Sequence, residues 1–153
     1  MRSLELKVPP LPLAVAIAAA MFGVSLLTPA AIVVIPGRIV ISVGLALFGS
    51  AIALAGVIAF RAHKTTVNPL NPSASSAVVS SGVYRLSRNP MYLGFLLALA
   101  AWSIYLSNAL AALFLPAFVA YMNQFQIKPE ERALNAKFGP DFSQYMAAVR
   151  RWV

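Results

Sequence analysis

The sequence predicts an all-α integral membrane protein with about four helices that cross or enter the membrane. Of its 153 residues, 60% are hydrophobic and only 10% are charged, which is too little charge to cover a water-soluble core. Residues 11–35 and 39–60 carry no charge, and each run exceeds the roughly 20 residues that a spanning helix needs. We therefore expect residues 1–60 to form two N-terminal spans.

A third uncharged run, residues 91–121, is too long for a single span. Ser107 and Asn108 near its middle indicate a turn. We predict a helical hairpin with arms 91–106 and 109–124, and a single kinked span is the alternative. The arms are short for full crossing. They would leave a pocket open to both the cytosol and the lipid.

Basic residues are distributed unequally around these segments. Eleven of the twelve lysines and arginines flank one side of the predicted arrangement, and Arg38 falls on the other. The positive-inside rule then places both termini and the loop 61–90 in the cytoplasm. The N-terminal run partly resembles a cleavable signal, but we expect it to be retained. The predicted organisation is one membrane domain, 1–153, which ends in a hairpin and tail over 91–153.

Composition also argues against two classes of site. The chain has no cysteine and one histidine, so we expect neither disulfides nor a metal centre. The net charge of +8 could suggest nucleic acid in a soluble protein. Here the basic residues flank apolar spans, where anionic membrane lipids are the simpler partner. We expect no binding to nucleic acid.

Local patterns predict how several helices begin, end and pack. In the second span, small residues recur at steps of four and three, which lets another helix approach closely. They are Ser42, Ala46, Gly49, Ala53 and Gly56. Asn89 and Pro90 form a helix start. Pro129 and Gly139 are expected to bound a short helix, after which an apolar face suits a helix lying in the membrane interface. That face carries Phe142, Tyr145, Met146, Val149 and Trp152.

Two polar clusters flank the predicted hairpin, which would return them to the same membrane face. The first contains Tyr84, Arg85, Arg88, Asn89 and Tyr92, and the second contains Glu130 and Glu131. Together they offer guanidiniums for a carboxylate, carboxylates for an amine or hydroxyl, and aromatic rings for a flat base or a cation. S-adenosylmethionine carries all of these groups.

The motif Arg88-Asn89-Pro90-Met91-Tyr92-Leu93-Gly94, followed by Glu130-Glu131-Arg132-Ala133-Leu134, Phe138-Gly139 and Tyr145, resembles the isoprenylcysteine carboxyl methyltransferase family. It is also similar to the related membrane phospholipid methyltransferases. The resemblance implies S-adenosylmethionine as cofactor, a cytosol-facing cofactor-binding tail and a lipid-like or prenylated substrate. The implied cofactor-binding residues are Tyr84, Arg88, Asn89, Pro90, Tyr92, Gly94, Glu130, Glu131 and Tyr145. Arg85, Arg88 and Arg150 are the expected partners of the acceptor.

One departure from the family pattern bears on the acceptor. Asn89 stands where the family often has histidine, and asparagine does not titrate near neutral pH. A carboxylate acceptor is already ionised at pH 7, so O-methylation is favoured over methylation of a phospholipid amine, which needs a base. The sequence is also compatible with a sterol-type membrane reductase and with a non-catalytic membrane scaffold.

Overall fold

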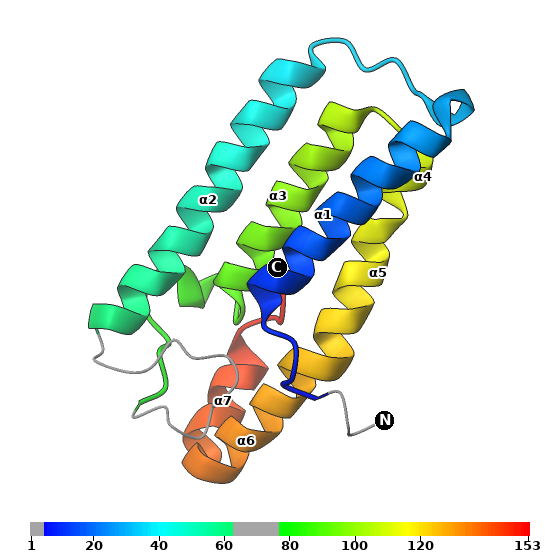
Figure 1. The fold of residues 1–153 in the computed structure, drawn as a ribbon. Helices are drawn as coiled ribbons and strands as arrows, with labels where there is room; N and C mark the ends of the chain where they lie inside the picture. Colours follow the sequence, from blue (N-terminus) through cyan, green and yellow to red (C-terminus); the bar gives the residue numbers. More distant parts are fainter. Residues whose placement is uncertain (1–4, 63–76) are drawn as a thin grey trace.

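The computed structural model describes residues 5–62 and 77–153, and this part of the chain is a helical bundle without strands (Figure 1). Its helices are α1 (Pro10–Leu27), α2 (Arg38–Ala62), α3 (Pro90–Leu106), α4 (Ala109–Ala112), α5 (Phe114–Tyr121), α6 (Lys128–Phe138) and α7 (Pro140–Ala148). A π-helical segment, Met122–Ile127, joins α5 to α6. Residues 63–76, which belong to the cytoplasmic loop predicted over residues 61–90, lie outside the described residues.

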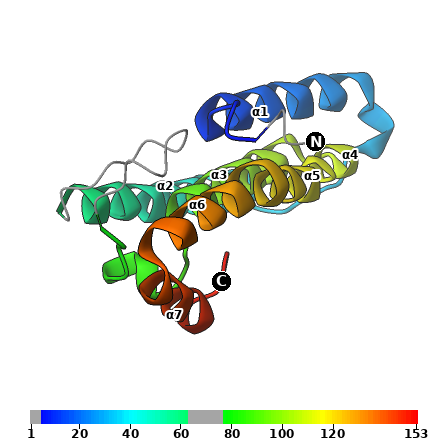
Figure 2. The same ribbon diagram turned by 90° about the horizontal axis from the view of Figure 1, so that it is seen from below.

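Three of the described helical segments are long and apolar enough to cross a membrane: Pro10–Leu27, Arg38–Ala62 and Ala109–Phe138. The fourth predicted membrane helix corresponds to the shorter apolar α3, which has 17 residues. At 1.5 Å per residue, α3 is about 25 Å long, and its complete crossing stays a prediction. Figure 2 shows α2, α3 and α5 side by side in one layer, with α1 on one face and α7 on the other.

The first span is shorter than its uncharged run. Helix α1 ends at Leu27, although the run without charge continues to residue 35. Pro29 disfavours helical backbone at Thr28, and Thr28 leaves the helix with its N–H still bonded to the carbonyl of Val24. The prediction that this helix extends over residues 11–35 was wrong at its C-terminal end. The uncharged run shows which residues suit the membrane, but it does not show where a proline ends the helix.

The small-residue stripe of α2 packs against α3, which confirms its predicted role. Ser42, Gly49 and Gly56 are the buried residues of α2. A Cβ added to Gly49 would lie 2.9 Å from the carbonyl oxygen of Gly94 on α3, and one added to Gly94 would lie 2.6 Å from that of Gly49. The two backbones meet here, so neither position has room for a side chain.

The predicted turn between α3 and α4 is present. Ser107 adopts a left-handed conformation with φ of 51° and ends α3. The side-chain oxygen of Asn108 accepts hydrogen bonds from the backbone N–H groups of Leu110 and Ala111, at 3.0 and 3.1 Å. Its amide nitrogen donates to the carbonyl and hydroxyl oxygens of Thr28. One buried side chain thus begins α4 and fastens it to the end of α1.

The second arm of the hairpin is longer than predicted. The helical path continues from Ala109 to Phe138 through a turn at Leu113 and the π-helical segment. Helix α6 begins at Lys128 with Pro129 in its first turn, as predicted, and Pro129 lacks the N–H that would bond the carbonyl of Phe125. That carbonyl accepts a hydrogen bond from the N–H of Leu6 instead, at 3.0 Å. The prediction that both arms are too short to cross the membrane, and so leave a pocket open to the cytosol and the lipid, is therefore wrong for this arm.

The C-terminal region folds back beside the start of α3 (Figure 1). Helix α6 ends where predicted, at Gly139 with φ of 54°, and α7 follows directly. Val149 is extended, so it does not continue the helical face of Phe142 and Tyr145. Trp152 lies beyond the helix and donates to the side chain of Asn123 at 3.1 Å. The prediction that Val149 and Trp152 share one helical face was therefore wrong.

Candidate functional site

Glu131 on α6 joins three parts of the chain at one end of the bundle. Its carboxylate accepts from Nε and Nη2 of Arg151, at 3.0 and 2.6 Å. The Nη1 atom of Arg88, just before α3, lies 3.0 Å from the same carboxylate. The side chains of Arg88 and Glu131 are 13% and 15% exposed. Because little water reaches this pair, the contacts are stronger than those of a surface ion pair.

Backbone hydrogen bonds hold the tail against the segment before α3. The N–H of Arg88 donates to the carbonyl of Arg150, at 3.0 Å. The side-chain amide of Asn89 donates to the carbonyl of Arg151, at 2.9 Å. Asn89 does occupy the N-cap position of α3, with Pro90 next, but its side chain does not cap the helix. The side chain instead fixes the tail that carries Arg151.

A second polar group lies one helical turn into α3. The hydroxyl of Tyr92 donates to the carboxylate of Glu130 at 2.6 Å, and the side-chain amide of Gln126 donates to the same oxygen at 2.5 Å. Gln126 and Glu130 are four residues apart, so they share one face of the helix. Tyr92 and Gln126 are buried. Two neutral donors thus stabilise the Glu130 carboxylate in a largely apolar setting.

Two tyrosines connect the segment before α3 to α7. The hydroxyl of Tyr145 donates to the carbonyl of Tyr84 at 2.8 Å. Burial raises the pKa of Tyr145 to about 12. Burial also raises the pKa of Tyr84 above its ordinary range, and the charges of Tyr145 and Glu130 add to the shift. Both phenols therefore stay neutral at physiological pH and act as hydrogen-bonding groups.

Two buried polar atoms of this region have no hydrogen-bond partner in the structure of the described chain: the hydroxyl of Tyr84 and Nε of Arg88. A buried donor without a partner costs about 1–3 kcal/mol. A bound molecule or water that accepts from such a donor removes this cost.

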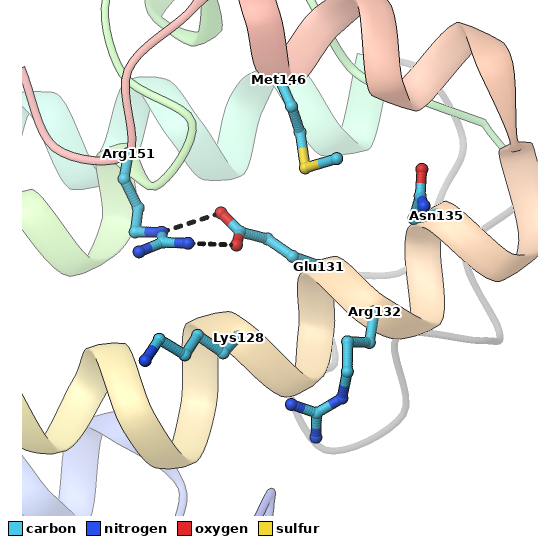
Figure 3. A pocket seen from close by; sticks show the side chains of 6 residues that line it. All are labelled: Lys128, Glu131, Arg132, Asn135, Met146 and Arg151. Carbon is cyan, nitrogen blue, oxygen red and sulfur yellow. Dashed lines mark hydrogen bonds and ion pairs between the residues drawn. The ribbon is translucent and has the colours of Figure 1, made fainter.

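An open pocket of about 410 Å³ adjoins Glu131 on its outer side (Figure 3). This volume lies within the range of small-ligand sites, about 300–1,000 Å³. Figure 3 shows Glu131 reaching towards Arg151, with Lys128 on the facing side. The lining residues are Lys128, Glu131, Arg132, Asn135, Met146 and Arg151.

The structure brings together many of the residues predicted from the sequence. Contacts connect Arg88 with Glu131, Asn89 with the tail, Tyr92 with Glu130, and Tyr145 with Tyr84. The side chains of Arg85 and Arg150 are exposed. Pro90 and Gly94 lie in the contact with α2, and their predicted cofactor roles gain no support from these contacts.

Sequence reasoning missed Gln126 and Arg151. The spacing of Gln126 and Glu130 could have indicated a shared helix face. Arg151 follows Arg150 directly, and the sequence alone did not indicate that Arg151 contacts Glu131. The role predicted for Arg150, as a partner of the acceptor, is a separate one and stays a prediction.

Comparisons with known proteins cover most of this region. The family model described as phospholipid methyltransferase matches residues 37–141. An uncharacterized protein of Haemophilus influenzae is 48% identical over 63 residues, which are 41% of this chain and 100% of that protein. Protein-S-isoprenylcysteine O-methyltransferase A of Arabidopsis thaliana is 32% identical over 101 residues, 66% of this chain and 51% of its own length. The chain thus spans about half of the Arabidopsis protein. No solved structure gives a significant match.

Proposed function

Because the chain belongs to the phospholipid methyltransferase family, we propose that it transfers a methyl group from S-adenosylmethionine to a lipid-like acceptor, at the cluster formed by Arg88, Glu131 and Arg151. The observation that carries this proposal is the ion-pair cluster itself. It joins the segment before α3, helix α6 and the tail. Arg88 and Glu131 of this cluster lie inside the matched range, residues 37–141, and Arg151 lies outside it.

The residues present suit the chemical groups of the cofactor. The partnerless Nε of Arg88 is a charged donor for a carboxylate. Glu131 offers carboxylate oxygens to an ammonium or to ribose hydroxyls. Tyr92 and Glu130 form the second pair that would line the same site. When bound, S-adenosylmethionine supplies an electrophilic methyl group on a sulfonium.

The contribution of the chain is to bind and orient the reactants and to keep water out. Asn89 and Tyr145 hold the tail and α7 against the start of α3, which keeps Arg88 near Glu131. Positioning of this kind contributes about 7–11 kcal/mol in well-oriented systems. Because the phenols of Tyr84 and Tyr145 stay neutral, we assign them binding roles and no proton transfer at neutral pH.

For the acceptor, we favour a carboxylate on a lipid-like or prenylcysteine-like molecule. A carboxylate is already a nucleophile at pH 7 and needs no base, which fits asparagine at position 89. Arg88 is the partner we propose for it. The exposed Arg85 and Arg150 stay predictions for this role. The name of the Arabidopsis relative agrees with O-methylation, although the match covers 51% of that protein.

The second candidate is a phospholipid amine as acceptor. The description of the matched family favours it. An amine must lose a proton before attack, and Glu130, bonded to Tyr92 and Gln126, is the carboxylate placed to take part. N-methylation thus predicts that Glu130→Gln removes turnover, whereas O-methylation tolerates that change if cofactor binding survives.

We also propose that this end of the bundle faces the cytosol, where S-adenosylmethionine is made available. Several segments meet at this end. The N-terminal segment bonds the π-helical segment through Leu6 and Phe125, and the start of α3 bonds the tail through Arg88 and Arg150. Most lysines and arginines flank this side of the predicted spans, and such residues are usually found on the cytoplasmic side of a membrane protein.

The test is transfer of a labelled methyl group from S-adenosylmethionine to lipid extracts and prenylcysteine analogues by the purified protein. We expect a labelled product in the lipid fraction, and alkali should release the label if it is a methyl ester. Asp141→Asn on the exposed side of α7 serves as a control that keeps turnover. Label transfer by folded protein to none of these acceptors would refute the proposed activity.

A further inference from the structure

The open pocket beside Glu131 has more positive than negative side chains around it. Its lining includes three cations, Lys128, Arg132 and Arg151, and one carboxylate, Glu131. That carboxylate is already shared between Arg88 and Arg151. Arg132 is paired with Glu5. These four cations and two carboxylates leave two positive charges in excess, so the pocket favours an anion.

Lys128 carries much of this excess. Its amino group donates to the neutral side-chain amide of Gln124, at 3.1 Å, which leaves its charge uncompensated within the part of the chain that the structure describes. Arg151 faces it across the pocket (Figure 3). Its Nε and Nη2 are bonded to Glu131, so Nη1 is the donor that it could turn towards a phosphate oxygen. An anion between the two side chains would meet the ammonium of Lys128 on one side and this guanidinium nitrogen on the other.

The position of Lys128 along its helix indicates the source of the anion. Between Arg88 and Lys128 the sequence has no charged residue, so Lys128 is the first charge after the apolar part of the helix that starts at Ala109. Such a residue lies at the level of the lipid headgroups. Met146 adds an apolar wall to the pocket, suited to the glycerol end of a lipid.

We propose that this pocket binds the phosphate group of an anionic membrane lipid between Lys128 and Arg151. The bound lipid is recognised through its phosphate and does not serve as the methyl acceptor. The site therefore adds a second ligand to the protein, and its occupancy does not depend on methyl transfer.

The test measures lipid binding directly, by calorimetric titration of the full chain in uncharged detergent with dihexanoyl phosphatidylglycerol. We expect saturable binding that Lys128→Gln weakens about five-fold and that Lys128→Arg retains. Lys137→Gln is the matched control, because Lys137 also lies on α6 but does not line the pocket. It should bind the lipid as the wild type does.

Two further titrations separate the sources of an anion. Zwitterionic dihexanoyl phosphatidylcholine and inorganic phosphate should each bind more weakly than phosphatidylglycerol. The proposal is overturned if phosphatidylcholine or free phosphate binds as tightly, or if Lys128→Gln and Lys137→Gln lose affinity equally. Because the readout is lipid binding, a failure of the proposed methyl transfer would leave this result unaffected.

Discussion

Replacing Gly94 with alanine tests whether the α2–α3 contact positions the site. The added Cβ would lie 2.6 Å from the carbonyl oxygen of Gly49, 2.7 Å from the Cβ of Ala53 and 3.1 Å from its backbone nitrogen. These are backbone or near-backbone atoms, which cannot move aside as the end of a long side chain does. Helix α3 would have to shift away from α2, and Tyr92 would move with it.

The expected cost follows from two opposing effects. Overpacking a close contact costs about 1–3 kcal/mol, whereas alanine in place of glycine favours a helix by about 1 kcal/mol. With the overpacking cost taken at its midpoint of about 2 kcal/mol, the free energy of unfolding should fall by about 1 kcal/mol. For a chain of this length that corresponds to a decrease in Tm of about 2–4 °C.

Thermal unfolding of the detergent-solubilised protein, followed by circular dichroism, measures this change. Gly44→Ala is the matched control, because a Cβ at Gly44 has nothing within 4 Å. We expect it to leave Tm unchanged or to raise it slightly. If Gly94→Ala unfolds at or above the temperature of the wild type, the close contact does not constrain α3 and the reasoning is wrong.

Two further predictions concern the far turn and α7. Asn108→Ala should lower the free energy of unfolding by about 2 kcal/mol, since a buried cap and its bonds to Thr28 are lost. Ser25→Ala removes an exposed hydrogen bond within α1 and should be neutral in the same denaturation assay. Equal effects of the two changes would contradict the role given to Asn108. Burial raises the pKa of Tyr145 to about 12, so the stability it contributes is complete below the pKa of a free phenol and is lost as pH rises towards 12. Tyr145→Phe should thus show a shallower alkaline fall in Tm than the wild type, and parallel curves would argue against a buried neutral phenol.

Much of the framework was predictable because it depends on local patterns. The steps of small residues in α2 indicated a close helix contact, and Gly49 and Gly94 form one. Asn108 lies in an uncharged run, where a polar residue with a turn preference marks the end of a helix. The order of the two polar motifs also indicated the family, which the match over residues 37–141 confirms.

The incorrect predictions depended on tertiary contacts that sequence spacing does not report. In the tail, α7 ends at Ala148 and Val149 is extended, so Val149 and Trp152 do not continue the predicted helical face. Trp152 instead donates to the side chain of Asn123, 29 residues earlier in the sequence. The second arm of the hairpin continues past residue 124 to Phe138, where the N–H of Leu6 bonds the carbonyl that Pro129 leaves free.

Glu131, held by Arg88 and Arg151, is the residue that we propose as part of a cofactor site. Calorimetric titration of purified wild-type protein with S-adenosylmethionine tests it most directly, alongside Glu131→Gln and the control Asp141→Asn. We predict saturable binding by the wild type and the control, and a loss of about ten-fold or more in affinity for Glu131→Gln. Equal affinity of Glu131→Gln and wild type, or no binding by folded wild-type protein, would contradict the account.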